Sequence, residues 1–214
     1  MGRLLQAVTR LVLFDGRGAS PLSQNFFSKF GFDHTFTQPG QLRAFLRAHL
    51  GESFRVLYQP SVAPPISLDD CDHASGLKKH FAAVTQLVIA CGSMIFAIDE
   101  VDRFTTASYA PPGLDYLINQ GRHVQVSLVC TSRRPAQIPR ELTSQAHQFF
   151  VFKNTEPGDL AYLQPYLGKE ATDRLPTLDD YTFLLWEESE GISIGGGIEK
   201  KLGSNRDTGA AACA

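Results

Sequence analysis

Short, mostly apolar runs recur along the chain, and each ends in a turn or in polar residues. The runs lie within residues 10–16, 54–60, 94–98, 124–132, 148–154 and 181–188. The run from Met94 to Ile98 has no polar alternation, which is typical of a strand buried on both faces, as in a parallel sheet. The pattern therefore predicts a strand at each of these positions.

Apolar residues at helical spacing separate most of these runs. After a Pro-Gly turn, a first helix is predicted from Leu42, Phe45, Leu46 and Leu50. A longer helix is predicted over residues 72–90, with one apolar face that contains Leu77, Phe81, Val84, Leu87 and Val88. Further helices are predicted over residues 111–121, 139–146 and 157–166. This alternation predicts an α/β fold, in which helices cover both faces of a three-layer, mostly parallel sheet.

Length and composition are those of an ordinary globular domain. The chain has 214 residues, of which 43% are hydrophobic, enough to bury a substantial core. We expect one α/β core over residues 1–188 and a glycine-rich flexible tail over residues 189–214. The formal net charge of -2 provides no global basic field, so contact with nucleic acid would require a local patch.

Cysteine usage and hydropathy indicate a soluble protein of the cytoplasm. The four cysteines show neither a CxxC pair nor a zinc-type spacing with histidine, so we expect reduced thiols. No apolar window approaches the length of a membrane span, and the N-terminus lacks the features of a signal peptide.

The stretch SMIFAIDEVDRF carries the clearest chemical signal. The apolar run from Met94 to Ile98 leads directly into Asp99 and Glu100. In open α/β sheets, ligands bind beyond the carboxyl ends of the strands. An apolar strand followed by Asp-Glu is the Walker B pattern of P-loop ATPases. The alternative is a strand that ends in solvated acids, with Asp99 capping a turn.

The segment from Leu117 to Gly168 resembles the region after Walker B in the FtsK/HerA superfamily of P-loop ATPases. This superfamily includes phage DNA-packaging ATPases and the ATPase domain of zonula occludens toxin-like phage proteins. The resemblance covers most of the chain from Leu11 to Trp186. It implies a RecA/ASCE-like fold, ATP and Mg²⁺ as cofactors, a homo-oligomeric ring, and double-stranded DNA as a partner. The implied location is the host cytoplasm or the virion.

The same resemblance implies roles for individual residues. Asp99 would bind the magnesium ion, and Glu100 would polarise the attacking water. The turn Ser132-Arg133-Arg134-Pro135 corresponds to the family's phosphate-sensing turn, in which Arg133 stands where the family usually has glutamine. Arg122 lies eleven positions before Arg133 and would be the arginine finger that enters the neighbouring subunit's site. The alternative for Arg122 is an ordinary helix-terminal arginine that faces solvent.

The sequence lacks the phosphate-binding motif that the resemblance calls for. No G-x-x-x-x-G-K-[ST] stretch is found, although backbone N–H groups and a lysine in such a loop hold the phosphates. Gly2 and Arg3 stand where the family's Gly-Lys is expected, so either the chain is truncated or the site is degenerate, with Arg3 in place of the lysine. Both accounts predict weak or lost binding of ATP and Mg²⁺.

The missing motif also bears on the sheet and on function. Without the strand that precedes the P-loop, strands 124–130 and 148–153 would each present an unpaired edge, or would move together. The leading hypothesis is an ATP-driven DNA-packaging or translocation motor. The alternative is a non-catalytic fragment or morphogenesis protein that keeps the fold without hydrolysing ATP. A third reading, a toxin-like protein that serves virion export at a membrane, lacks a membrane anchor in this sequence.

Overall fold

The computed structural model describes residues 8–17, 31–61, 71–188 and 190–195. The chain divides into two compact units, residues 1–145 and 146–214. The predicted site residues Gly2 and Arg3 lie outside the described residues.

The first unit contains a five-stranded sheet in the order β2-β3-β1-β4-β5. Its strands are β1 (Arg10–Phe14), β2 (His34–Phe36), β3 (Phe54–Tyr58), β4 (Met94–Ile98) and β5 (Val126–Cys130). Every neighbouring pair is parallel. The predicted α/β fold with a mostly parallel sheet is therefore confirmed. The three-residue strand β2 was not predicted, because it is too short and too polar to form an apolar run.

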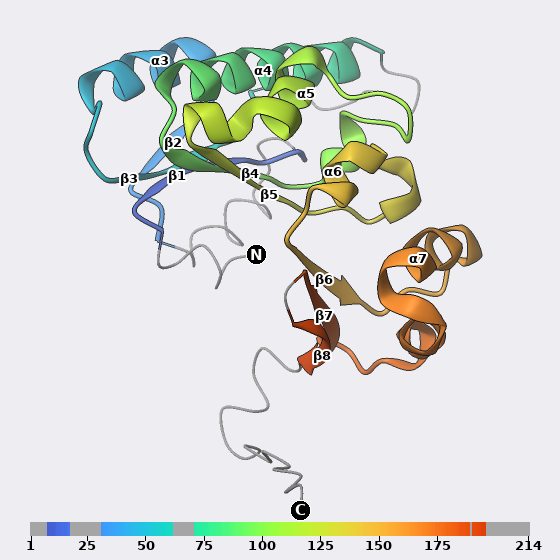
Figure 1. Ribbon diagram of the computed structural model, residues 1–214. Coiled ribbons are helices and arrows are strands. Elements are labelled where there is room, and N and C mark those ends of the chain that lie inside the picture. The colour runs from blue at the N-terminus through green and yellow to red at the C-terminus, as the bar shows by residue number, and fades with distance from the viewer. Residues whose placement is uncertain (1–7, 18–30, 62–70, 189, 196–214) are drawn as a thin grey trace, which may run out of the picture. The chain divides into compact units, whose positions relative to one another are not determined.

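Three helices pack on one face of this sheet: α3 (Pro39–Ala48), α4 (Cys71–Cys91) and α5 (Pro112–Gln120) (Figure 1). Successive side chains of a strand point to opposite faces. Accordingly, Val12 and Phe14 join the core beneath the helices, whereas Leu11 and Leu13 form a smaller cluster with Leu57 and Ala97. Both sets are almost fully buried, which explains the unbroken apolar run of β1.

The predicted apolar face of α4 is confirmed, and that of α3 is confirmed in part. Leu77, Phe81, Val84 and Val88 are buried, with Leu87 packed against them. In α3, Leu42 and Leu46 are buried with Phe45 against them. The prediction that Leu50 extends this face is wrong. Leu50 is 63% exposed, because the helix ends at Ala48 and the chain turns at Gly51, whose φ is +85°.

The second unit contains an antiparallel sheet in the order β6-β7-β8. Its elements are β6 (Gln148–Phe152), α7 (Pro157–Arg174), β7 (Phe183–Glu187) and β8 (Gly191–Gly195). The helix α7 continues beyond the predicted 157–166 and is kinked at Gly168, and its leucines pack on Leu184 of the sheet. The last two predicted strands thus pair with each other rather than with the parallel sheet. Residues 191–195 of the predicted tail form β8, and residues 196–214 lie outside the described residues.

Among the described residues, β5 and β6 both lie at the edge of a sheet, as β2 and β8 do. β5 pairs only with β4, and β6 pairs only with β7. Within its own unit, and among the described residues, each of these two predicted strands therefore has one edge without a paired strand. In the first unit, α5 is followed by the 3₁₀ turn η3 (Gly121–Val124), and β5 by η4 (Pro135–Gln137) and α6 (Arg140–Ser144).

Candidate active site

Polar residues follow four adjacent strands at the same level of the sheet. In register, Phe14 pairs with both Tyr58 and Ile98, and Ile98 pairs with Cys130. The residues that come next are Asp15, Gln59, Asp99 and Thr131. Because all four strands are parallel, these residues meet at one edge, the carboxyl edge, where α/β proteins bind ligands.

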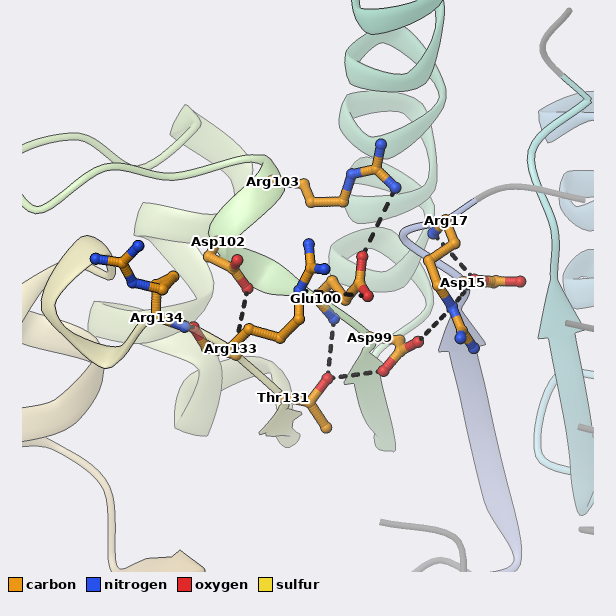
Figure 2. Close-up of polar contacts among 10 residues, drawn as sticks. Asp15, Arg17, Asp99, Glu100, Asp102, Arg103, Thr131, Arg133 and Arg134 are labelled. Carbon is orange, nitrogen blue, oxygen red and sulfur yellow. Dashed lines mark hydrogen bonds and ion pairs between the residues drawn. The ribbon is translucent and has the colours of Figure 1, made fainter. Parts of the chain in front are cut away.

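The two predicted acids are mostly buried and ion-paired. Asp99 Oδ1 accepts a hydrogen bond of 2.7 Å from the Thr131 hydroxyl, and Asp99 Oδ2 lies 3.3 Å from Arg17 Nε (Figure 2). The Asp99 side chain is 17% exposed and that of Glu100 is 14% exposed. The alternative of two solvated acids therefore does not fit.

Glu100 lies between two guanidinium groups. Its Oε1 is 3.6 Å from Arg133 Nε, and its Oε2 is 3.7 Å from Arg103 Nη1 (Figure 2). Arg103 comes from η2 (Val101–Arg103), directly after β4. Arg133 comes from the turn after β5 and is 70% exposed. The carboxylate of Glu100 is thus held by one cation from each of two neighbouring strand ends.

The ends of β1 and β4 meet in direct backbone contact. The Asp99 N–H donates to the Phe14 carbonyl at 3.0 Å. A Cβ atom on Gly16 would lie 2.1 Å from the Asp99 carbonyl oxygen, so only glycine fits there. This contact brings Asp15 and Arg17 beside Asp99.

Asp15 is fully buried and shares the Arg17 guanidinium with Asp99. Burial raises the pKa of the Asp15 carboxyl above its usual value of 3.8, although hydrogen bonds from Gln59 and the Arg17 backbone oppose the shift. Gln59 Nε2 donates to Asp15 Oδ2 at 3.1 Å. The other amide atom, Gln59 Oε1, is buried and has no hydrogen-bond partner in the described part of the chain.

The raised pKa of Asp15 predicts a pH-dependent stability that Asp15→Asn should remove. The folded state holds this proton more tightly than the unfolded state, so the stabilisation is fully present below the unfolded pKa of about 3.8 and is lost as pH rises through the folded pKa. As pH rises from about 3.8 through the folded-state pKa of Asp15, the unfolding free energy of the wild type should therefore fall relative to that of Asp15→Asn. Urea unfolding at a series of pH values measures the difference, and parallel pH profiles would contradict the prediction.

The structure brings together three of the residues predicted for the site, and sets one apart. Asp99, Glu100 and Arg133 lie at the carboxyl edge. Arg122 is exposed and belongs to η3, which precedes β5. It therefore lies at the opposite, amino edge of the parallel sheet and does not reach the acids of its own chain.

Sequence reasoning missed Arg17, Arg103 and Thr131 as members of this site. Thr131 follows an apolar strand directly, as Asp99 does, and Asp15-Gly16-Arg17 follows another. Polar residues that immediately follow predicted parallel strands were the available signal.

Cys130 ends β5, directly before Thr131 of this edge. Cys91 and Cys130 are both free in the described residues. Burial raises the pKa of Cys130 to about 12, which keeps the thiol protonated near neutral pH.

The chain is similar to several solved structures but matches no protein-family model and no curated protein. The genome packaging NTPase B204 from Sulfolobus turreted icosahedral virus 2, in complex with AMPPCP, matches with a TM-score of 0.61 and 21% identity over 93% of this chain and 88% of that chain. The DNA-packaging ATPase B204 from Sulfolobus Turreted Icosahedral Virus matches with a TM-score of 0.61 and 20% identity over 92% and 87%. The N-terminal domain of zonular occludens toxin from Neisseria meningitidis has a TM-score of only 0.34 and adds nothing to this.

No helix in the described part of the chain has both the length and the apolar character needed to cross a membrane. The α/β fold predicted from the sequence is shared with these solved structures. The chain has the α/β fold of the viral genome-packaging NTPases.

Proposed function

We propose that this chain is the nucleotide-hydrolysing core of an ATP-driven DNA-packaging or translocation motor of phage or mobile-element type. One observation carries the proposal: Asp99 and Glu100 follow a buried central strand at the carboxyl edge, and Arg133, from the turn after the neighbouring strand β5, has its Nε 3.6 Å from Glu100 Oε1. The fold is that of B204, whose structures include complexes with AMPPCP and ATP-gammaS. Acids and guanidinium groups at one strand edge are the groups that phosphoryl transfer uses.

Glu100 is the residue that orients and polarises the attacking water. Its carboxylate lies between Arg103 and Arg133, which come from the ends of two neighbouring strands. Phosphate oxygens compete with a carboxylate for guanidinium groups. A bound triphosphate would therefore draw Arg133 from Glu100, leaving the carboxylate to accept a hydrogen bond from water.

Asp99 is the residue that holds a magnesium ion. No group of three or more His, Cys, Asp or Glu residues suited to a metal occurs in the described residues. Magnesium in nucleotide sites needs only one or two carboxylates, because phosphates and water supply the other ligands. Asp99 fits this limited role through Oδ2, where Arg17 now supplies the positive charge. When bound, the ion neutralises charge on the phosphate oxygens.

Arg122 fits a role in a neighbouring subunit rather than in its own. It lies at the amino edge of the sheet, away from Glu100, and is exposed. In a homo-oligomeric ring, each Arg122 would reach the next subunit's carboxyl edge and offset charge on the phosphoryl group. Double-stranded DNA is the proposed cargo of this ring.

The second candidate function is that of a non-catalytic assembly protein with the same fold. It is favoured by the absence of any G-x-x-x-x-G-K-[ST] motif from the 214 residues. Positioning is a large part of phosphoryl-transfer catalysis, so a chain without a phosphate loop holds its substrate poorly. A phosphate loop encoded in frame upstream of the Met1 codon would favour the motor, whereas a stop codon close by would favour the assembly protein.

Phosphate release from ATP tests the motor hypothesis on the 214-residue chain itself. We expect slow hydrolysis that requires magnesium and saturates only at high ATP concentration, because no lysine-bearing loop holds the phosphates. Inorganic phosphate is measured over ATP concentrations that extend into the millimolar range, with magnesium or with chelator. Equal release in both conditions would contradict hydrolysis and favour the assembly role.

A further inference from the structure

Thr131 has every polar atom engaged by the turn that carries the two acids. Its N–H donates to the Ile98 carbonyl at 3.0 Å, and its carbonyl accepts the Val101 N–H at 2.9 Å. Its hydroxyl donates to Asp99 Oδ1 at 2.7 Å and accepts the Glu100 N–H at 2.9 Å (Figure 2). Residues 98–101 thus wrap around a single residue of the neighbouring strand end.

The direction of both hydroxyl bonds is fixed by chemistry. A backbone N–H can only donate, so the Thr131 oxygen must be the acceptor from Glu100. The one hydroxyl hydrogen is then left for Asp99 Oδ1, which accepts it. Serine can make the same two bonds, whereas valine has the shape of threonine but can make neither.

The bond to Glu100 supports an unusual backbone conformation. Glu100 has φ 55° and ψ 57°, in the left-handed region that a non-glycine residue adopts only at a cost. That conformation turns the chain out of β4 and aims the Glu100 side chain toward Arg103 and Arg133. Without an acceptor, its N–H would lie unpaired beside the sheet end, which disfavours the turn.

The bond to Asp99 sets which carboxylate oxygen faces the rest of the site. With Oδ1 held by Thr131, Oδ2 is the atom that faces Arg17 at 3.3 Å. Thr131 also precedes the turn in which the Arg133 N–H lies 3.4 Å from Asp102 Oδ1. A movement of the turn that carries Arg133 would therefore also move Thr131, and with it the two acids to which Thr131 is hydrogen-bonded.

We propose that Thr131 is the positioning residue that fixes Asp99 and Glu100 relative to one another for hydrolysis. The effect of Thr131 on hydrolysis rests on the proposed function. Thr131 does not touch the substrate in this scheme; it acts through the two carboxylates, by orienting one and by holding the backbone of the other.

The test compares Thr131→Val with Thr131→Ser and with Thr85→Val. Thr85 is a buried threonine whose hydroxyl donates to the Phe81 carbonyl within α4, so it controls for loss of a buried hydroxyl elsewhere. The first readout is hydrogen exchange of the Glu100 amide, measured by NMR without nucleotide. Thr131→Val should speed this exchange about tenfold or more, the loss expected for one hydrogen bond. The other two variants should match the wild type.

The second readout is ATP hydrolysis by the same proteins. Thr131→Val should lower kcat about tenfold or more while KM changes little, and Thr131→Ser should restore kcat. Unchanged Glu100 exchange in Thr131→Val would overturn the positioning role, as would wild-type kcat in that variant. The wild type could hydrolyse no ATP while the exchange rate of the Glu100 amide still depends on Thr131. That result would contradict the proposed function but would support the role of Thr131 in holding the Glu100 backbone.

Discussion

Replacement of Glu100 by glutamine should abolish magnesium-dependent ATP hydrolysis while leaving ATP binding and the fold intact. Glutamine keeps the size of the side chain but cannot polarise water as a carboxylate does, and general-base groups typically contribute about 10²–10⁴-fold to rate. The ion pairs lost to Arg103 and Arg133 are 3.7 and 3.6 Å long and partly exposed, so their removal should cost little stability.

The measurement pairs phosphate release with binding of a fluorescent ATP analogue. Glu52→Gln is the matched control, because Glu52 is an exposed residue of a turn in the same unit. Its hydrolysis rate should equal that of the wild type. A Glu100→Gln protein that hydrolyses ATP at the wild-type rate would remove Glu100 from the mechanism.

Replacement of Phe14 by alanine should lower the free energy of unfolding by about 3–5 kcal/mol, the usual cost of emptying a fully buried aromatic site. Phe14 is 0% exposed. Its ring stacks on Tyr58 at 5.5 Å and meets Phe81 and Phe104 edge-on at 5.3 and 5.5 Å. The loss is a large part of the about 5–15 kcal/mol that stabilises a typical domain.

Urea unfolding followed by far-ultraviolet circular dichroism measures this effect. Tryptophan fluorescence is less suitable, because the single tryptophan, Trp186, belongs to the second unit. Tyr116→Ala serves as the control: this side chain is 39% exposed in the same unit and should change stability by less than about 1 kcal/mol. Equal midpoints for the two variants would contradict the role of Phe14 in the core.

The parallel sheet was predictable because its central strands, β1, β3 and β4, are largely buried on both faces. The runs Leu11–Phe14 of β1 and Met94–Ile98 of β4 have no polar residue to break them, β3 has only Arg55, and the residue after each of the three strands is polar. These patterns located Asp99 and Glu100 and the face of α4. They could not reveal β8, whose sequence Gly-Ile-Ser-Ile-Gly reads as a glycine-rich tail until it pairs with β7.

The site was predictable only in part, because its contacts join residues far apart in the chain. Thr131 and Asp99 are 32 residues apart, and Gln59 and Asp15 are 44 residues apart. Which strand end lies beside which depends on the strand order, and an apolar run carries no information about its neighbours. Arg17 and Arg103 were missed for the same reason, since lone arginines after a strand usually lie on an ordinary solvated surface.

The close approach of Gly16 to the Asp99 carbonyl determines how this site can adapt to a ligand. The backbone at Asp99 and Glu100 is held by this contact and by the hydrogen bonds of Thr131. We therefore expect it to move little when a ligand binds. Rearrangement then falls on the long cationic side chains around the acids, of which Arg133 is 70% exposed and Arg103 33% exposed. We expect ligand-free and ligand-bound forms to share one backbone trace at this edge and to differ in the rotamers of their arginines.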